Sequence, residues 1–163
     1  MSSFIFLATN DEMPELDYTR TRYITVKEAM DLGIKPHALV PWEKLDPNAR
    51  VLLVENEEDL HELVITKNDC CDVSNYTSYS FIYEVTFVYT EVRTQQLLAY
   101  IKENMKEGQI VEMWKVWLDH EDDELTIPYT RCNYDELSLN DLMPLYNRAH
   151  EKYKLQDCVV IER

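Results

Sequence analysis

The fold class is decided by the stretch from Tyr79 to Leu118, which reads YSFIYEVTFVYTEVRTQQLLAYIKENMKEGQIVEMWKVWL. Its first part, residues 79–89, carries Tyr, Phe or Val at every odd position and a mixed set of side chains at the even positions. Because successive side chains of a strand point to opposite faces, this period of two predicts a strand with one buried, aromatic face.

The middle of the stretch changes to the period of a helix. Apolar side chains fall at helical spacing along one edge, and Gly108 stands where a helix commonly ends. The residues of that edge are Leu97, Leu98, Ile101 and Met105. Residues 110–118 are again apolar on both faces and predict a second strand. Strand, helix and strand with short connections predict a crossover between two parallel strands of one sheet, which need not be adjacent.

Further strands are expected on both sides of this unit. Apolar runs predict them at 4–8, 51–54, 125–127 and 158–161. The runs at 4–8 and 51–54 read as buried strands. Residues 60–67 fit either a helix or a strand, and we expect a brief helical turn followed by a strand that pairs with the 79–90 run. Residues 68–78 would then be the connection of a hairpin.

One more helix follows from its end signals. Thr25 and Glu28 match a capping box, in which the two side chains satisfy exposed backbone amides reciprocally. Gly33 would close the helix after about two turns, because glycine adopts the left-handed cap without a steric penalty. The sequence therefore predicts a helix at 26–32.

The last helix has to accommodate Pro144, which is tolerated in a first helical turn. We therefore expect its cap at Asn140 or Asp141 and its body at 142–154.

These elements together predict an α+β fold. We expect a single domain, 1–163, with a mixed or mainly antiparallel sheet of five to seven strands and about three helices. The central strand–helix–strand unit at 79–118 would organise it, with the helix at 92–107 packed on the sheet.

The composition excludes several classes of function. The chain carries 31 acidic and 16 basic residues, a net charge of −15, so we expect no nucleic-acid partner. Glycine occurs only at Gly33 and Gly108, which removes the dinucleotide fingerprint, the P-loop and the nucleophile elbow. No apolar run approaches a membrane span and the N-terminus lacks the features of a signal peptide. A cytoplasmic protein without membrane association is expected.

The acidic run at 119–124 is the strongest candidate for an interaction site. Its carboxylates are Asp119, Glu121, Asp122, Asp123 and Glu124, with His120 among them. The favoured interpretation is a solvated turn, and the functional one is a patch that binds a partner. Metal binding is disfavoured because the spacing does not match a calcium loop. An acid–base site is disfavoured because adjacent strand residues such as Asp119 and His120 point to opposite faces.

The remaining histidines and cysteines add no motif. The four histidines are scattered without paired-ligand spacing, and no C-x-x-C occurs, so we expect no metal or other cofactor. Cys70 and Cys71 are adjacent, and two reduced thiols near a loop are favoured over a redox pair.

Two hypotheses for function remain. The first is a non-enzymatic interaction module, of the inhibitor or immunity type, that neutralises a basic protein partner; it is favoured by the net charge. The alternative is a small enzyme or ligand-binding domain with a pocket beneath the 34–49 loop, using a carboxylate with a histidine. No sequence feature fixes the oligomeric state.

Overall fold

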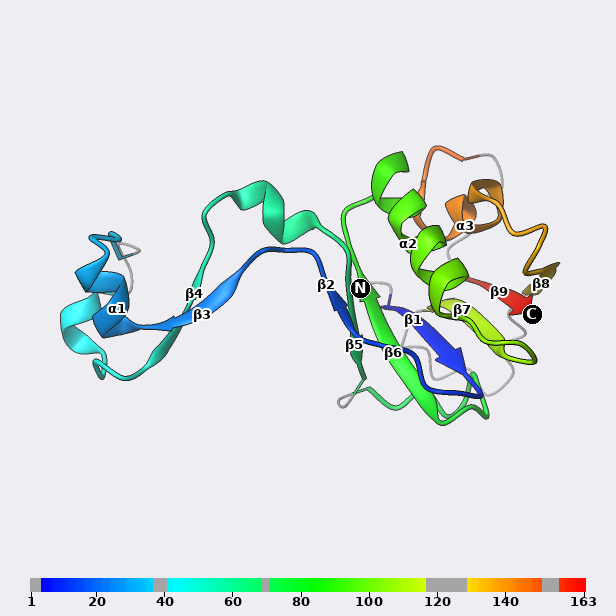
Figure 1. Ribbon diagram of the computed structural model, residues 1–163, viewed down its shortest axis with the longest axis horizontal. Helices are drawn as coiled ribbons and strands as arrows, with labels where there is room; N and C mark the ends of the chain where they lie inside the picture. Colours follow the sequence, from blue (N-terminus) through cyan, green and yellow to red (C-terminus); the bar gives the residue numbers. More distant parts are fainter. Residues whose placement is uncertain (1–3, 37–40, 69–70, 117–128, 151–155) are drawn as a thin grey trace. The chain divides into compact units, whose positions relative to one another are not determined.

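The computed structural model describes residues 4–36, 41–68, 71–116, 129–150 and 156–163 (Figure 1). Backbone contacts divide the chain into two compact units. The principal unit comprises Met1–Tyr18 and Glu62–Arg163, and the inserted unit is Thr19–His61. The prediction that the whole chain is one domain stays a prediction.

The principal unit is built on a sheet whose described strands number seven. In spatial order they are β2 (Leu16–Asp17), β5 (Val64–Lys67), β6 (Phe81–Thr86), β1 (Phe4–Thr9), β7 (Ile110–Val116), β9 (Asp157–Glu162) and β8 (Tyr129–Asn133). Every neighbouring pair is antiparallel except β8 and β9, which are parallel. The predicted α+β fold with a mixed, mainly antiparallel sheet is confirmed.

The predicted crossover is present around the central strand β1. Phe6 of β1 lies opposite Glu84 of β6 on one side and Trp114 of β7 on the other, and both pairings are antiparallel. β6 and β7 therefore run parallel to each other with β1 between them. Helix α2 (Glu91–Asn104) connects them, as the sequence predicts for non-adjacent parallel strands.

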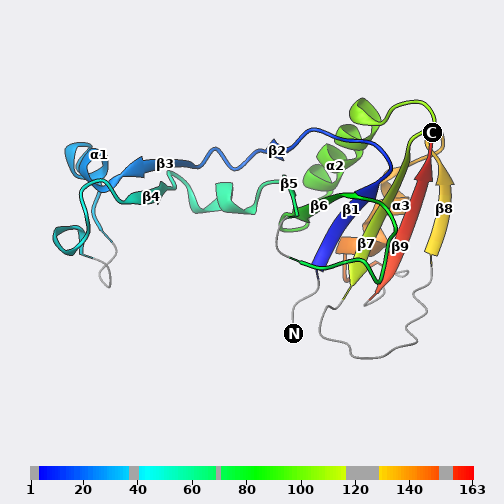
Figure 2. The same ribbon diagram turned by 90° about the horizontal axis from the view of Figure 1, so that it is seen from below.

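The two described helices of the principal unit, α2 and α3 (Leu139–Tyr146), pack on one face of this sheet (Figures 1 and 2). The predicted edge of α2 is confirmed, because Leu97, Ile101 and Met105 are buried and Leu98 packs against the same core. Leu142 and Leu145 of α3, together with Met113 and Tyr83 of the sheet, complete that core. Burial of this apolar surface is the main stabilisation of the unit.

The opposite face of the sheet carries a second, smaller core. Phe6 and Val116 are fully buried there under Val73, which belongs to the connection between β5 and β6. The ring of Phe6 stacks on Trp114 with centroids 6.0 Å apart. The part of this connection around Val73 and Tyr76 therefore also covers the sheet.

The inserted unit contains two paired strands, with a short helix in the connection between them. Strands β3 (Arg22–Thr25) and β4 (Arg50–Leu53) pair antiparallel, and α1 (Val26–Asp31) follows β3 directly. The predicted capping box is confirmed: the amide of Thr25 donates to the Glu28 carboxylate at 2.7 Å, and the amide of Glu28 donates to Thr25 Oγ1 at 3.1 Å.

Gly33 ends α1 as predicted. Its φ of 70° is left-handed, its amide donates to the carbonyl of Met30, and the amide of Ile34 donates to that of Ala29. These two bonds satisfy carbonyls at the helix end that would otherwise lack a partner. The Trp42 indole then donates to the carbonyl of Ile34 at 3.2 Å, so half-buried Trp42 folds back on the end of this helix.

Three details of the expected elements are wrong. The run at 51–54 is not a buried strand, because β4 pairs only with β3 among the described strands and its residues are exposed or half-buried. The final helix is Leu139–Tyr146 rather than 142–154, with its cap at Ser138. Gly108 does not cap α2, because the helix ends at Asn104 and its C-cap is Met105 in an extended conformation. Gly108 lies in the turn that follows, with a φ of 76°.

The position of Pro144 explains why the predicted bounds of the final helix are wrong. Pro144 is the sixth residue of α3, beyond the first turn, and the carbonyl that it cannot bond belongs to exposed Asn140. Water can satisfy that carbonyl, so a proline is tolerated in this short helix. The helix begins early because Ser138 and Asp141 form its capping box, with the Ser138 amide 2.8 Å from the carboxylate.

Other expectations are met or lie outside the described residues. The helical turn and strand expected in 60–67 are a 3₁₀ helix at Glu57–His61 and β5, which pairs with β6. The expected strand at 125–127 falls in residues 117–128, outside the described part. Within the described residues, no helix is long and apolar enough to cross a bilayer.

Candidate functional site

The predicted partner-binding carboxylates lie outside the described residues. Asp119, Glu121, Asp122, Asp123 and Glu124 all fall in 117–128, so their role stays a prediction. The described strands that flank this segment are β7, which ends at Val116, and β8, which begins at Tyr129.

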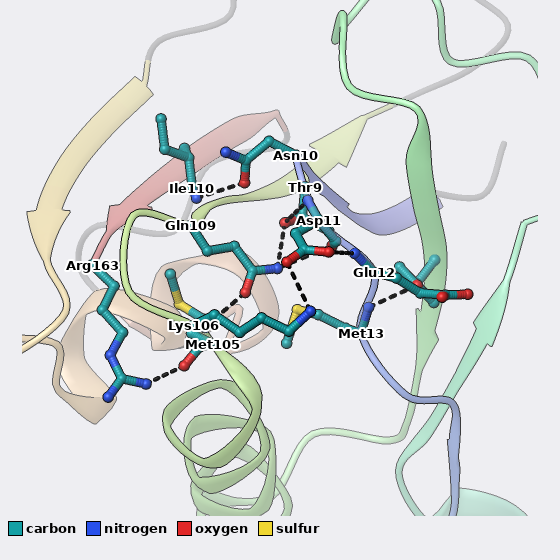
Figure 3. A network of polar contacts seen from close by, with 11 residues as sticks. Thr9, Asn10, Asp11, Glu12, Met13, Met105, Lys106, Gln109, Ile110 and Arg163 are labelled. Atoms are coloured by element: carbon teal, nitrogen blue, oxygen red, sulfur yellow. Dashed lines mark hydrogen bonds and ion pairs between the residues drawn. The ribbon is translucent and has the colours of Figure 1, made fainter.

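A polar corner joins the end of β1 to the turn after α2, as Figure 3 shows. Buried Gln109 is its centre: the side-chain amide donates to Thr9 Oγ1 at 2.8 Å and to the carbonyl of Asp11 at 3.0 Å. Its carbonyl oxygen accepts from the amide of Lys106 at 2.8 Å. One side chain therefore satisfies groups on two turns that are far apart in the sequence.

Two ion pairs surround this corner. Lys106 Nζ lies 2.7 Å from Asp11 Oδ2, and Lys67 Nζ lies 2.6 Å from Glu12 Oε1. Hydrogen bonding to Lys106 lowers the pKa of Asp11, and hydrogen bonding to Lys67 lowers the pKa of Glu12. The pKa of Lys67 is raised by the same bond to Glu12. These shifts keep the groups charged at neutral pH, so they are poorly suited to proton transfer.

The corner borders a concave surface of about 410 Å³. Its lining residues are Glu12, Met13, Pro14, Glu15, Lys67 and Lys106. Much of this lining is already engaged, since Glu15 accepts from the amide of Lys67 at 2.8 Å and both lysines pair with carboxylates. These contacts hold β5 against the turn after β1, and that turn against the turn after α2. The surface that remains for a ligand is shallow and polar.

A second concave surface, of about 430 Å³, lies against the connection between β5 and β6. Asn68 organises one side of it by donating to the carbonyl of Cys71 at 2.7 Å and accepting from the Cys71 amide at 3.1 Å. Asp72 accepts from the amide of Ser74, which lowers the pKa of its carboxyl. These bonds are typical of polar turns.

His61 is paired with a carboxylate, but not in a cavity. His61 Nδ1 lies 3.4 Å from Glu58 Oε2, but both side chains are largely exposed and three residues apart on one 3₁₀ helix. Among the described residues, no group of three or more His, Cys, Asp or Glu side chains could hold a metal. The alternative of a pocket beneath the 34–49 loop stays untested, because 37–40 lie outside those residues.

Two of the thiols are suppressed as nucleophiles by burial. Burial raises the pKa of Cys132 to about 11, and it also raises the pKa of fully buried Cys158. Thiolate is the reactive form, so neither side chain resembles a redox sensor. Cys70 lies outside the described residues, and the question of a Cys70–Cys71 pair stays open.

Sequence reasoning missed the apolar surface of the inserted unit. Several of its large apolar side chains are 44–61% exposed: Tyr23, Met30, Leu32, Leu52 and Leu60. Tyr23 and Leu52 lie directly opposite each other across β3 and β4, and the Arg50 guanidinium sits 5.0 Å from the centre of the Tyr23 ring. In the strand at residues 22–25, Ile24 alone is buried and its neighbour Tyr23 is exposed. The alternation of side chains along a strand was the sequence signal that could have indicated this exposure.

Charge is unevenly divided between the two units. The inserted unit has eight acidic and six basic residues, a net charge of −2, which leaves 23 acidic and ten basic residues, net −13, in the principal unit. Most of the net negative charge therefore belongs to the principal unit, whereas exposed large apolar side chains occur in both units.

The chain matches no family model, no curated protein and no solved structure.

Proposed function

We propose that this protein is a non-enzymatic interaction module whose acidic principal unit binds a basic protein partner. The observation that supports the proposal is the net charge of −13 in that unit. Opposite charges accelerate encounter between partners and favour the correct orientation. A cytoplasmic location, expected from the sequence, is part of the same proposal.

Part of the acidic surface is visible in the described residues. In the principal unit, acidic side chains outnumber basic ones by more than two to one. Several of the basic side chains, including Lys67, Lys106 and Arg131, are already paired with carboxylates. Exposed carboxylates include Glu91, Glu103, Glu107, Asp135 and Glu136. Such a surplus supports binding to a cationic surface, with the 119–124 run as the proposed centre.

The test is affinity purification with the full chain as bait, at low salt, followed by identification of the retained proteins. We expect a basic protein, and we expect the affinity of the purified pair to fall as salt rises, because the attraction is screened. Recovery of no basic protein, or a complex that is insensitive to salt, would contradict the proposal.

Two matched variants locate the binding surface. One neutralises the proposed centre by replacing its five carboxylates with amides: Asp119→Asn, Glu121→Gln, Asp122→Asn, Asp123→Asn and Glu124→Gln. The other removes five charges elsewhere by the same chemistry: Glu91→Gln, Glu103→Gln, Glu107→Gln, Asp135→Asn and Glu136→Gln. We expect the first variant to weaken binding to the basic partner much more than the second. Equal loss would favour a diffuse electrostatic effect over a defined site.

A further inference from the structure

We propose that the inserted unit, Thr19–His61, opens and closes on its own while the principal unit stays folded. In the open state the pairing of β3 with β4 and the turns of α1 are lost, and their backbone amides meet solvent. Opening is a property of the chain alone and needs no basic partner.

The inserted unit has little buried core of its own. Among its described residues, the buried apolar side chains are Ile24, Val26 and Ala29, and others such as Val51 are half-buried. The principal unit buries apolar side chains on both faces of its sheet, in two separate cores. Because the hydrophobic contribution to stability follows the apolar area that is buried, opening of the inserted unit costs much less free energy than unfolding of the principal unit.

The regular structure of the inserted unit is short. β3 and β4 have four residues each, and α1 has six. At the start of α1, the amide of Val26 donates to the carbonyl of Ala49 at 2.9 Å. The amide of Lys27 donates to the carbonyl of Pro47 at 3.0 Å, so the helix is tied to the segment before β4. Two paired strands alone, or a helix of this length alone, are marginal in water. These elements therefore depend on one another and open together.

Arg20 adds strain near the start of the inserted unit. Its φ of 55° lies in the left-handed region, which is costly for a residue with a Cβ atom. The hydroxyls of its neighbours, Thr19 and Thr21, are hydrogen-bonded to each other at 2.8 Å. Opening releases Arg20 to ordinary backbone conformations, so the strain favours the open state.

Opening stops at the ends of the inserted unit because the principal unit holds both flanking segments. The amide of Tyr18 donates to the carbonyl of Leu63 at 3.0 Å, next to the paired strands β2 and β5. Leu63 is fully buried, and Glu62 pairs with Arg93 at 2.8 Å. The last residue before the insertion and the first residue after it are therefore fixed within the principal unit.

The chain that leads to the insertion is fixed as firmly. β1 lies between β6 and β7 in the sheet (Figure 1). Beyond β1, the amide of Met13 donates to the Tyr83 hydroxyl at 3.0 Å, and the Tyr100 hydroxyl donates to the carbonyl of Pro14 at 2.6 Å. Tyr83 and Tyr100 are both buried. All of these contacts lie within the principal unit, so they persist when the inserted unit opens.

The test is hydrogen–deuterium exchange of the full chain, followed by NMR or by mass spectrometry of its peptides. We expect the hydrogen-bonded amides of α1, β3 and β4 to share one level of protection. That level should be at least about a hundredfold below the protection of β1 and β7, because opening free energies range from near zero to the global value. Equal protection of the two units would overturn the inference.

Two variants with the same chemistry distinguish independent opening from fraying of a single unit. Ile24→Val removes a buried methylene group from the inserted unit, and Ile161→Val removes one from the core of the principal unit. Each should accelerate exchange by roughly two- to tenfold, the usual effect of this substitution in a core. Ile24→Val should accelerate α1, β3 and β4 together and leave β1 and β7 unchanged. Ile161→Val should accelerate β1 and β7 and leave the inserted unit unchanged.

Both substitutions are conservative, and a circular dichroism spectrum equal to that of the wild type verifies that each variant is folded. If either variant accelerates exchange in both units by the same factor, the chain opens as one unit and the inference fails. If Ile24→Val accelerates β3 alone, the inserted unit frays strand by strand, and the inference fails as well.

Discussion

Arg93 and Glu62 form an ion pair in which two guanidinium nitrogens donate to one carboxylate oxygen, Nε at 3.1 Å and Nη2 at 2.8 Å. The side chains are only 11% and 27% exposed. Glu62 is the first residue of the principal unit after the inserted unit, and Arg93 lies in the first turn of α2. Nη1 also donates to the carbonyl of Val88 at 3.1 Å. Arg93 therefore links Glu62 to the segment that precedes α2.

Removing this guanidinium should destabilise the principal unit. The variant Arg93→Met keeps a long, unbranched side chain but removes the guanidinium, so the partly buried Glu62 carboxylate loses its partner. We expect the free energy of unfolding to fall by about 2 kcal/mol, below the loss of about 3–5 kcal/mol typical of fully buried pairs. Urea denaturation measures the change. Glu58→Gln, which removes the exposed pair with His61, is the control and should have little effect.

Gln109 should be equally sensitive because it is the centre of the polar corner. Gln109→Leu preserves the approximate size but leaves the carbonyl of Asp11 and the amide of Lys106 without their bonds. We expect a loss of about 2–3 kcal/mol in the free energy of unfolding, the cost of buried groups left unsatisfied. Gln95→Leu on the exposed side of α2 is the matched control. A similar loss in both variants would show that the network contributes little.

The ion pair of Glu12 with Lys67 predicts a measurable dependence on pH. The ammonium lowers the pKa of the Glu12 carboxyl below its unfolded-state value of about 4.3. The pair therefore stabilises the fold above that value, and its contribution is lost as the pH falls through the lower, folded-state pKa. Lys67→Met should raise the pKa of Glu12, observed by NMR titration of its carboxyl carbon. Lys106→Met should raise that of Asp11 first and affect Glu12 less.

The thiols predict slow alkylation of the native protein. With a pKa of about 11, Cys132 is ionised to roughly one part in a thousand at pH 8. Iodoacetamide should therefore label Cys132 slowly until denaturant is added, and fully buried Cys158 more slowly still. Mass spectrometry of the labelled peptides measures both rates. Rapid native labelling of Cys132 would contradict the assigned burial.

Local patterns were sufficient for much of the fold because each reflects one element. The aromatic alternation before α2 marks β6, and the edge from Leu97 to Met105 marks the face of α2 on the sheet. The capping box of Thr25 and Glu28 fixes the start of α1. These signals depend on neighbours within a few residues, so they survive without knowledge of the tertiary structure.

The candidate surfaces were less accessible to such reasoning. The acidic run at 119–124 is evident from composition, but its role stays a prediction. The pairing of Tyr23 with Leu52 depends on the register of two strands that are distant in the sequence. Nothing local to either residue indicates the other, and the network of Gln109 with Thr9 and Asp11 is equally non-local.

The sequence by itself therefore determined the mixed α+β architecture, the crossover between the parallel strands β6 and β7, and the strong acidity of the chain. Only the tertiary structure decided that the apolar run of β4 is half-exposed and that the chain divides into two units. The physical reason is competition for partners. An apolar strand is buried only where other elements cover its faces, and β4 pairs with β3 in a sheet of two strands.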